Sequence, residues 1–158
     1  MQTVLITGAS AGFGNLVAEK LLAKGFTVYA AARRVEKMRD LESLGAHIMH
    51  MDVTDTESVN AGVAKVIEEQ QRIDVLFNNA GYGSYGTIED VPLEEIQRQY
   101  DVNVFGMGRL VQAVLPQMRK QGSGRIINTA SVVGHVSTAV LGWYASTKHA
   151  VEAFSDAL

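Results

Sequence analysis

Short runs rich in apolar residues alternate along the chain with longer segments of helical periodicity. The short runs cover residues 4–6, 26–31, 47–51, 73–77 and 125–129, and each has the length of one buried strand. Between them, apolar residues recur three and four positions apart in the segments 13–24, 35–44, 54–71 and 92–120. A last segment with this spacing begins near Trp143. The pattern therefore predicts five strands that alternate with five helices.

Capping and breaking residues mark several of the predicted element ends. Gly25 follows the first helical segment, where a left-handed C-cap is typical. Thr54 or Asp55 can cap the third helix. Pro116 lies inside the long segment 92–120, where a proline kinks a helix or removes one of its hydrogen bonds. We therefore expect the long helix to be irregular at Pro116.

Strands that alternate with helices are typical of parallel βαβ units with right-handed crossovers. Strands that are apolar on both faces belong in a sheet that helices cover on both sides. We predict an α/β fold of this doubly wound, Rossmann-like kind, with residues 1–158 forming a single dinucleotide-binding domain. Ligands bind such sheets at the carboxyl ends of the strands. Polar or glycine-rich segments follow four of the strands, and they should share that edge: 7–14, Asp52, 78–81 and Ser131.

Composition narrows the chemistry that the chain can support. The net charge is −3, from 14 basic and 17 acidic residues, which gives no global reason to bind nucleic acid. There are no cysteines, so disulfides and thiolate nucleophiles are excluded. His47 and His50 are poorly spaced on a strand for a shared metal ion, and we predict no metal site. No segment is long and apolar enough to span a bilayer, and the N-terminus lacks signal-peptide features, so we predict a cytoplasmic protein.

Three glycines, Gly8, Gly12 and Gly14, form a G-x-x-x-G-x-G pattern between the first strand and the first helix. Glycine permits positive φ and a close approach of the backbone to a ligand. The amides at the start of the following helix, together with the helix dipole, favour a bound diphosphate. The pattern indicates a dinucleotide site, although an ordinary strand-to-helix turn would use glycines in the same way.

The second strand leads into Arg33 and Arg34, where an acidic residue would bind the adenosine ribose of NAD. Guanidinium groups match a phosphate in geometry and in charge. The pair favours NADP(H) as cofactor over NAD(H), and the alternative is a solvated pair at a helix start. Asp52 could accept a hydrogen bond from the adenine amino group or could serve as a cap.

Near the end of the chain, Tyr144 and Lys148 are four residues apart on the last helix and project from one face. A cation beside a tyrosine stabilises its phenolate, so the phenol can exchange a proton with a carbonyl or alcohol oxygen. Ser131 could hydrogen-bond the same oxygen. Tyrosine–lysine pairs at this spacing are also common on helix surfaces, so the pair is informative only with the other motifs.

Taken together, these motifs resemble the short-chain dehydrogenase/reductase family. The resemblance rests on segments in the family's order and approximate spacing, namely Thr7-Gly8-Ala9-Ser10-Ala11-Gly12-Phe13-Gly14, Asn78-Asn79-Ala80-Gly81, Asn103, Ser131 and Tyr144-Ala145-Ser146-Thr147-Lys148. The resemblance implies the strand order 3-2-1-4-5. It also implies that members continue beyond the Tyr–Lys helix with further strands, so we expect this chain to be truncated within that helix.

The resemblance also implies roles for the candidate residues. Tyr144 would be the general acid/base, Ser131 would polarise the substrate oxygen, Lys148 would hold the nicotinamide ribose, and Asn103 would fix a water in a proton relay. A larger set would bind the cofactor: Gly8, Ser10, Gly12, Phe13, Gly14, Arg33, Arg34, Asp52, Val53, Asn79, Ala80, Gly81, Tyr144 and Lys148. Phe13 departs from the usual aliphatic residue, and we expect it to pack at the strand–helix junction.

The leading prediction is an NADP(H)-dependent oxidoreductase that interconverts an alcohol and a ketone or aldehyde. Val133, His135, Val136 and Trp143 lie near Ser131 in the sequence and could line a moderately apolar substrate pocket, with loop packing as the alternative. Tyr82 and Tyr85 are candidates of the same kind. The resemblance further implies a homodimer or homotetramer through the long helix and the Tyr–Lys helix. Gly106 and Gly108 should let another helix approach.

Two other functions are compatible with the sequence. A non-catalytic dinucleotide-binding module is the main alternative, because a sheet that ends at the fifth strand would leave that edge exposed. An enzyme that epimerises or dehydrates nucleotide sugars with bound NAD would share the fold. The paired arginines and the form of the glycine-rich turn disfavour this second alternative.

Overall fold

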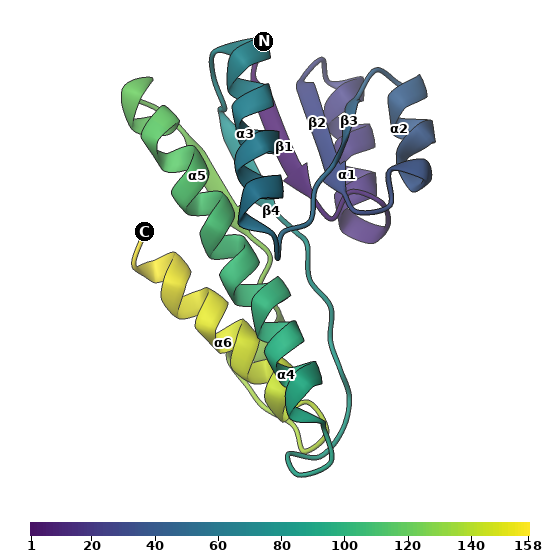
Figure 1. Ribbon diagram of the computed structural model, residues 1–158, viewed down its shortest axis with the longest axis vertical. Helices are drawn as coiled ribbons and strands as arrows, with labels where there is room; N and C mark the ends of the chain where they lie inside the picture. The colour runs from purple at the N-terminus through teal and green to yellow at the C-terminus, as the bar shows by residue number, and fades with distance from the viewer.

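The computed structural model describes residues 1–158 as a parallel five-stranded sheet with helices on both faces (Figure 1). The spatial order is β3-β2-β1-β4-β5, and every neighbouring pair is parallel, which confirms the predicted fold class and order. The order in which successive strands are added to the sheet reverses between β1 and β4. Open α/β sheets bind their ligands at such a switch point. The strands are β1 (Thr3–Thr7), β2 (Thr27–Ala32), β3 (His47–His50), β4 (Val75–Asn78) and β5 (Arg125–Asn128).

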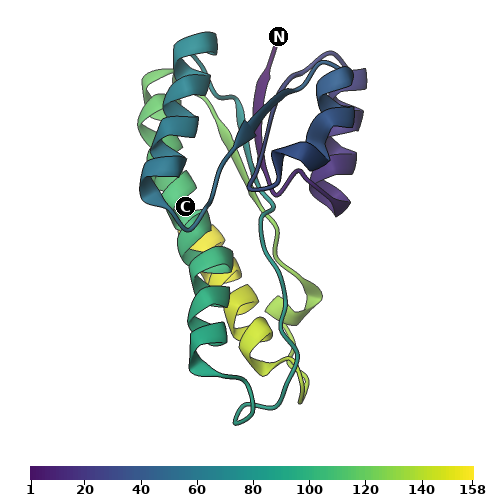
Figure 2. The ribbon, with the colours of Figure 1, turned by 45° about the vertical axis from the view of Figure 1, so that its right-hand side comes forward.

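Two groups of helices cover the two faces of the sheet (Figure 2). Helices α1 (Gly12–Ala23) and α2 (Arg39–Ser43) pack on one face. Helices α3 (Thr56–Gln70) and α5 (Met107–Lys120) pack on the other face. Helices α4 (Leu93–Tyr100) and α6 (Gly142–Asp156) lie on the α5 side and extend beyond the carboxyl ends of the strands (Figure 1). None of these helices is both long and apolar enough to pass through a bilayer.

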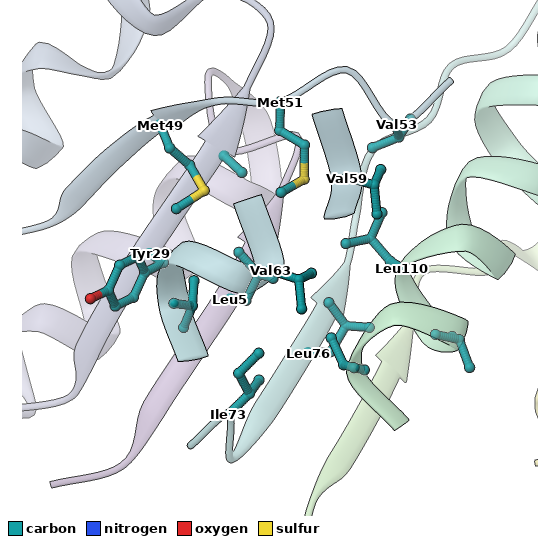
Figure 3. Close-up of a cluster of buried hydrophobic side chains, with 14 of the residues drawn as sticks. Leu5, Tyr29, Met49, Met51, Val53, Val59, Val63, Ile73, Leu76 and Leu110 are labelled. Carbon is teal, nitrogen blue, oxygen red and sulfur yellow. The ribbon is translucent and has the colours of Figure 1, made fainter. Parts of the chain in front are cut away.

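The larger of two apolar clusters lies between the sheet and helices α3 and α5 (Figure 3). Val59, Val63 and Val66 lie on one face of α3, at the spacing that the sequence predicted, and are at most 3% exposed. They meet Leu5 and Leu76 of the central strands, which are fully buried. A fully buried aliphatic side chain contributes about 1.5–3 kcal/mol to stability. This face therefore fixes α3 and α5, and with them the loops that begin at the sheet edge.

Two element ends follow the sequence prediction closely. Gly25 has φ +80° just after α1, the left-handed conformation that the sequence predicted. Asp55 is the N-cap of α3, and its side chain accepts a hydrogen bond from the amide of Glu57 at 2.9 Å. Thr54, the alternative cap, instead donates to Asp52 through both its amide and its hydroxyl.

The long helical segment is interrupted at a point that its hydrophobic spacing does not mark. Residues Asp101–Gly106 form a π-helical segment between α4 and α5, whereas α5 continues as an α-helix through Pro116. Pro116 therefore does not end α5, and the expected cost of one hydrogen bond follows from its missing N–H. The widened turn contains Asn103, whose buried side chain is bonded to another segment, and such π turns often occur at functional sites.

Two smaller expectations also need correction. The helical segment near 35–44 begins as a 3-10 turn, Val35–Met38, before the short α2. Gly106 does not make room for another helix, because a Cβ there would lie 2.8 Å from a methyl carbon of Val53, in the loop after β3. Gly108 does face a helix, since the nearest atom to its Cβ position, at 3.9 Å, belongs to Phe154 of α6.

Candidate cofactor and catalytic site

A single cleft of about 880 Å³ lies at the carboxyl edge of the sheet and gathers nearly all the residues expected to carry function. Residues that follow each of the five strands line it, as the doubly wound topology requires. Of the predicted site residues, only Gly14 and Asn103 do not line the cleft. Those that do are Gly8, Ser10, Gly12, Phe13, Arg33, Arg34, Asp52, Val53, Asn79, Ala80, Gly81, Ser131, Tyr144 and Lys148.

The glycine-rich turn is fastened to the segment after β4. Gly8 has φ +66°, and a Cβ there would lie 2.9 Å from the Cα of Ala80. The Asn79 side-chain amide donates to the carbonyls of Thr7 and Gly8 at 3.2 and 3.3 Å, and the Thr7 hydroxyl accepts from the amides of Asn79 and Ala80. Gly14 belongs to this packing, because its Cβ position is 2.6 Å from the Asn79 side-chain nitrogen. These contacts require glycine at both positions and hold the turn in place.

The start of α1 faces the cleft with free donors. Its N-cap, Ala11, has no side chain that could accept from the first amides of the helix, and the first turn carries no acidic residue. Unpaired amides and the positive end of the helix dipole attract an anion. The residues of the turn, Ser10 to Gly12, line the cleft directly before these amides. The turn therefore suits a cofactor diphosphate.

The expectation that Phe13 packs at the strand–helix junction is wrong. Its side chain is 73% exposed and lines the cleft. The buried positions of α1 are Gly14 and Ala18, so the residue one position before Gly14 points away from the sheet. An exposed aromatic ring at this place is available to a ligand in the cleft.

Basic side chains cluster at the end of β2. Arg33 and Arg34 are both exposed and both line the cleft, and neither forms an ion pair with a carboxylate of the chain. The cleft has one carboxylate, that of Asp52. Burial raises the pKa of that carboxyl, but hydrogen bonds from Thr54 and the charge of Arg33 together outweigh burial and lower it. Asp52 is thus an ionised acceptor, with Oδ1 bonded to Thr54 and Oδ2 free of protein donors.

Tyr144 and Lys148 lie on the first two turns of α6 and face the cleft together. The Lys148 ammonium is 5.8 Å from the centroid of the Tyr144 ring. Lys148 is only 6% exposed, and burial lowers the pKa of its ammonium group. One hydrogen bond, donated to the carbonyl of Thr129 at 2.6 Å, holds the amine at the end of β5. This leaves further ammonium donors for a ligand, since a lysine has three.

Ser131 follows β5 and lines the cleft beside Thr129 and Ala130. Its backbone is extended, and its hydroxyl caps the short 3-10 turn Val132–Gly134 by accepting from the amide of Val133 at 3.4 Å. This contact is long and occupies only an acceptor position. The hydroxyl proton therefore remains available to donate to an oxygen in the cleft.

Asn103 lies behind the cleft and is 3% exposed. Its Oδ1 accepts from the amide of Tyr82 at 3.0 Å, and its Nδ2 donates to the carbonyl of Tyr82 at 2.8 Å and to the Thr147 hydroxyl at 3.1 Å. The side chain thus joins the segment after β4 to α6. Gly83 of that segment lies against the Tyr144 ring. A Cβ built on Gly83 would be 3.3 Å from a carbon of that ring. Asn103 thereby fixes the backbone on which the phenol rests.

Sequence reasoning missed several residues of the cleft wall. Thr7 follows β1 and was quoted only as part of a motif, although its hydroxyl joins two of the cleft segments. Tyr82, by contrast, was a candidate for the substrate pocket, and it does line the cleft. No local signal marks Arg98 or Val102, because they reach the cleft only through the packing of α4 and the π segment.

The substrate-pocket candidates near Ser131 lie outside the cleft. Val133 is buried, and the His135 ring nitrogen Nε2 is 3.4 Å from a carboxylate oxygen of Glu152. Trp143 donates its indole N–H to the carbonyl of Ile88 at 3.1 Å. These contacts agree with the alternative of loop packing for His135 and Trp143. Val136 remains 54% exposed nearby.

The chain belongs to the short-chain dehydrogenase family. The model of that family, described as short chain dehydrogenase, matches residues 2–158. The order of its motifs along the chain and the fold described above agree with this assignment.

Characterised relatives and a solved structure support the same placement. The chain is 42% identical over 158 residues to a 3-ketodihydrosphingosine reductase of Bacteroides thetaiotaomicron, covering 99% of the chain and 57% of that protein. It is 38% identical over 168 residues to an NADPH-dependent 3-dehydrocapnine reductase of Ornithobacterium rhinotracheale, covering 100% of the chain and 59% of that protein. The crystal structure of a short-chain dehydrogenase from Streptomyces avermitilis superposes with a TM-score of 0.96 at 40% identity, covering 99% of the chain and 58% of that structure. The chain thus spans less than two thirds of each of these proteins.

Proposed function

We propose that this protein is an NADP(H)-dependent oxidoreductase that interconverts a ketone and a secondary alcohol, with Tyr144 as the general acid/base. The carrying observation is that one cleft holds the glycine-rich turn, the arginines after β2 and the Tyr144–Lys148 pair. The cofactor, when bound, supplies or accepts the hydride. A site that also moves a proton at the substrate oxygen completes the reaction.

The residues that would hold the cofactor fit its chemistry along the length of the cleft. The glycine-rich turn and the free amides of α1 suit the diphosphate. Arg33 and Arg34 suit a 2′-phosphate, and they stand directly after β2 where an acidic residue would oppose it. The free oxygen of Asp52 suits the adenine amino group. One relative is named as NADPH-dependent, which supports the same preference.

At the other end of the cleft, the side chains divide the proton chemistry between them. In the reducing direction, the Tyr144 phenol donates its proton to the carbonyl oxygen, and the Ser131 hydroxyl hydrogen-bonds that oxygen as negative charge develops. The Lys148 ammonium, close to the Tyr144 ring, stabilises the phenolate that remains. Asn103 holds the backbone of Tyr82 and so positions the segment that supports the phenol.

A moderately apolar ketone is the proposed substrate. Exposed apolar side chains lie on the loops that flank Ser131 and Tyr144, including Val132, Val136, Val140 and Ile88, which are 49–75% exposed. The loops carrying Ile88 and Val140 are joined by a hydrogen bond from the Gly86 amide to the Val140 carbonyl at 3.0 Å. Two relatives are named as reductases of a 3-keto and a 3-dehydro compound, which favours a ketone within a longer chain.

We also propose that the protein is a cytoplasmic homodimer or homotetramer. Leu93 and Phe105, on α4 and the π segment, are 61% and 57% exposed, as large apolar residues at an interface between copies would be. Mass measurement in solution tests this, and a monomer at every concentration would refute it.

The activity is tested by following NADPH oxidation with a panel of ketones of increasing chain length, using the whole protein and its Tyr144→Phe variant. We expect turnover by the unsubstituted protein and a loss of at least about a hundredfold in the variant, with cofactor affinity nearly unchanged. Turnover that survives in Tyr144→Phe would refute the acid/base role. Cofactor binding with no turnover of any ketone would favour a non-catalytic dinucleotide-binding module.

A further inference from the structure

The guanidinium of Arg98 lies over the ring of Tyr82 at the edge of the cleft, where the proposed reaction gives Arg98 no role. The guanidinium carbon of Arg98, on the last turn of α4, lies 5.8 Å from the centroid of the Tyr82 ring. Both residues line the cleft. Helix α4 lies on the side of the sheet that faces away from α1 (Figure 2).

The charge of Arg98 has no carboxylate partner within 4.0 Å. Three other arginines, Arg39, Arg72 and Arg109, each meet a carboxylate within 4.0 Å, whereas Arg98 meets none. The charged side chains that line the cleft are Arg33, Arg34, Arg98, Lys148 and the single acid Asp52. A chain with net charge −3 thus concentrates positive charge in one cleft, which is typical of a site for a polyanion.

The backbone that carries the Tyr82 ring is held in place beneath this guanidinium. Asn103 bonds both the amide and the carbonyl of Tyr82, so the backbone under the ring is held at two points. Burial raises the pKa of the Tyr82 phenol, the nearby Glu95 carboxylate raises it further, and the charges of Arg98 and Arg33 oppose this. The phenol therefore stays neutral. Arg98 and Arg33 both line the cleft.

We propose that Arg98, held over the ring of Tyr82, binds a phosphate group of the dinucleotide from the α4 side of the cleft. This inference rests on the proposed function, because it assumes that NADP(H) occupies the cleft. A guanidinium offers paired donors to phosphate oxygens, and stacking on an aromatic ring fixes their direction before the ligand arrives. In the proposed function the reacting carbonyl lies at Ser131 and Tyr144, which leaves the charge of Arg98 for a phosphate of the cofactor.

Calorimetric titration with NADP⁺ and with NAD⁺ tests this assignment in the whole protein. Arg98→Gln keeps much of the side-chain volume and removes the charge, so NADP⁺ affinity should fall about tenfold or more. A loss confined to NADP⁺ assigns Arg98 to the 2′-phosphate, and an equal loss with NAD⁺ assigns it to the diphosphate. Arg119→Gln is the matched control, since Arg119 is an exposed arginine outside this cleft, and its affinities should not change.

The role of the ring is tested by a double-mutant cycle. Tyr82→Leu should weaken NADP⁺ binding severalfold in the unsubstituted background and have no further effect in Arg98→Gln. Additive losses would overturn the claim that the ring acts through Arg98. Unchanged affinity of Arg98→Gln for both dinucleotides, or an effect limited to the KM of the ketone, would overturn the phosphate contact. Failure of the proposed function gives a different result, because the unsubstituted protein would then bind neither dinucleotide.

Discussion

The side-chain amide of Asn103 forms two hydrogen bonds with the backbone of Tyr82: Oδ1 accepts from the N–H at 3.0 Å, and Nδ2 donates to the carbonyl at 2.8 Å. Asn103 lies in the π segment between α4 and α5, and Tyr82 lies in the segment that runs from β4 past the Tyr144 ring. A third bond, to the Thr147 hydroxyl, ties the same amide to α6. One buried side chain therefore sets the relative positions of three segments around the site.

Asn103→Asp should separate this positioning role from simple loss of volume. The substitution is isosteric, but it removes the donor and places an oxygen against the Tyr82 carbonyl in a buried site. We expect the free energy of unfolding to fall by about 2–3 kcal/mol in denaturant titrations, because buried partners lose their hydrogen bonds. Asn60→Asp, at an exposed position of α3, is the matched control and should change it by less than about 0.5 kcal/mol. Equal effects of the two changes would show that the amide of Asn103 is dispensable.

Lys148→Met should lower turnover strongly while leaving the free energy of unfolding nearly unchanged. Methionine fills a similar volume without a buried charge, so the free energy of unfolding at neutral pH should stay within about 1 kcal/mol of the unsubstituted value. Turnover of a ketone should fall at least about a hundredfold, because the variant lacks the cation beside Tyr144. A fully active variant would contradict the role proposed for the ammonium.

The same substitution predicts a change in pH dependence. Burial lowers the Lys148 pKa below its ordinary 10.5, so between the two values the unfolded chain binds more protons than the folded protein. Stability contributed by this group must therefore rise with pH through that alkaline window. Thermal melts of the unsubstituted protein should show this rise, and Lys148→Met should lack it. Identical alkaline profiles for the two proteins would contradict the buried environment of the amine.

Periodicity and turn residues were enough to predict the sheet and its helices. The valines of α3 and the glycine after α1 act locally, so Val59, Val63 and Gly25 could be assigned from sequence. The π segment could not, because Asp101–Gly106 has ordinary helical spacing and its conformation accompanies the long-range bonds of Asn103.

The sequence predicted those site residues that belong to its motifs. Each motif follows a strand, and parallel strands bring such segments to one edge regardless of their separation in sequence. The prediction that Phe13 is buried was wrong because it assumed that an apolar residue packs in the core, whereas Phe13 lies on the face of α1 that borders the cleft. Arg98 was missed because only the packing of α4 beside Tyr82 brings it to the site.

Arg33→Ser tests the cofactor preference. The guanidinium follows β2 and lines the cleft with no carboxylate partner, so its removal should cost mainly the contact with a 2′-phosphate. We expect the Kd for NADPH to rise about tenfold or more and the Kd for NADH to change little, both measured by cofactor fluorescence. Equal losses for the two cofactors would mean that Arg33 does not read the 2′-phosphate. Arg119→Ser serves as the control for removing one exposed arginine.

Gly8→Ala should damage the cleft more than a comparable change elsewhere. A Cβ at Gly8 would meet the Cα of Ala80 at 2.9 Å, and the residue also has φ +66°. Backbone strain and overpacking together should lower the free energy of unfolding by about 3 kcal/mol and abolish NADPH binding. Gly25→Ala is the matched control, because Gly25 has φ +80° with nothing within 4 Å of its Cβ position, and it should cost only about 1–2 kcal/mol. If both variants lost the same stability, the contact with Ala80 would not matter.

Acid stability should depend on a carboxylate at the start of β4. Asp74 is 8% exposed, and its carboxylate accepts from the Thr3 amide at 2.7 Å and pairs with the Arg72 guanidinium. The Arg72 hydrogen bond is the largest of several influences that lower the Asp74 pKa below its ordinary 3.8. The folded protein therefore binds fewer protons than the unfolded chain near that pH, so this stability is present above 3.8 and is lost as pH falls through the folded pKa.

Arg72→Gln removes the main cause of the lowered pKa and should move the midpoint of acid unfolding to higher pH, as followed by circular dichroism. Arg39→Gln is the matched control, because Arg39 and Glu42 form an exposed pair at i and i+3, and such pairs contribute little. The acid midpoint of Arg39→Gln should stay close to that of the unsubstituted protein. If Arg72→Gln also kept that midpoint, the bond between β1 and β4 through Asp74 would owe nothing to its arginine, and the Thr3 amide alone would hold the carboxylate ionised.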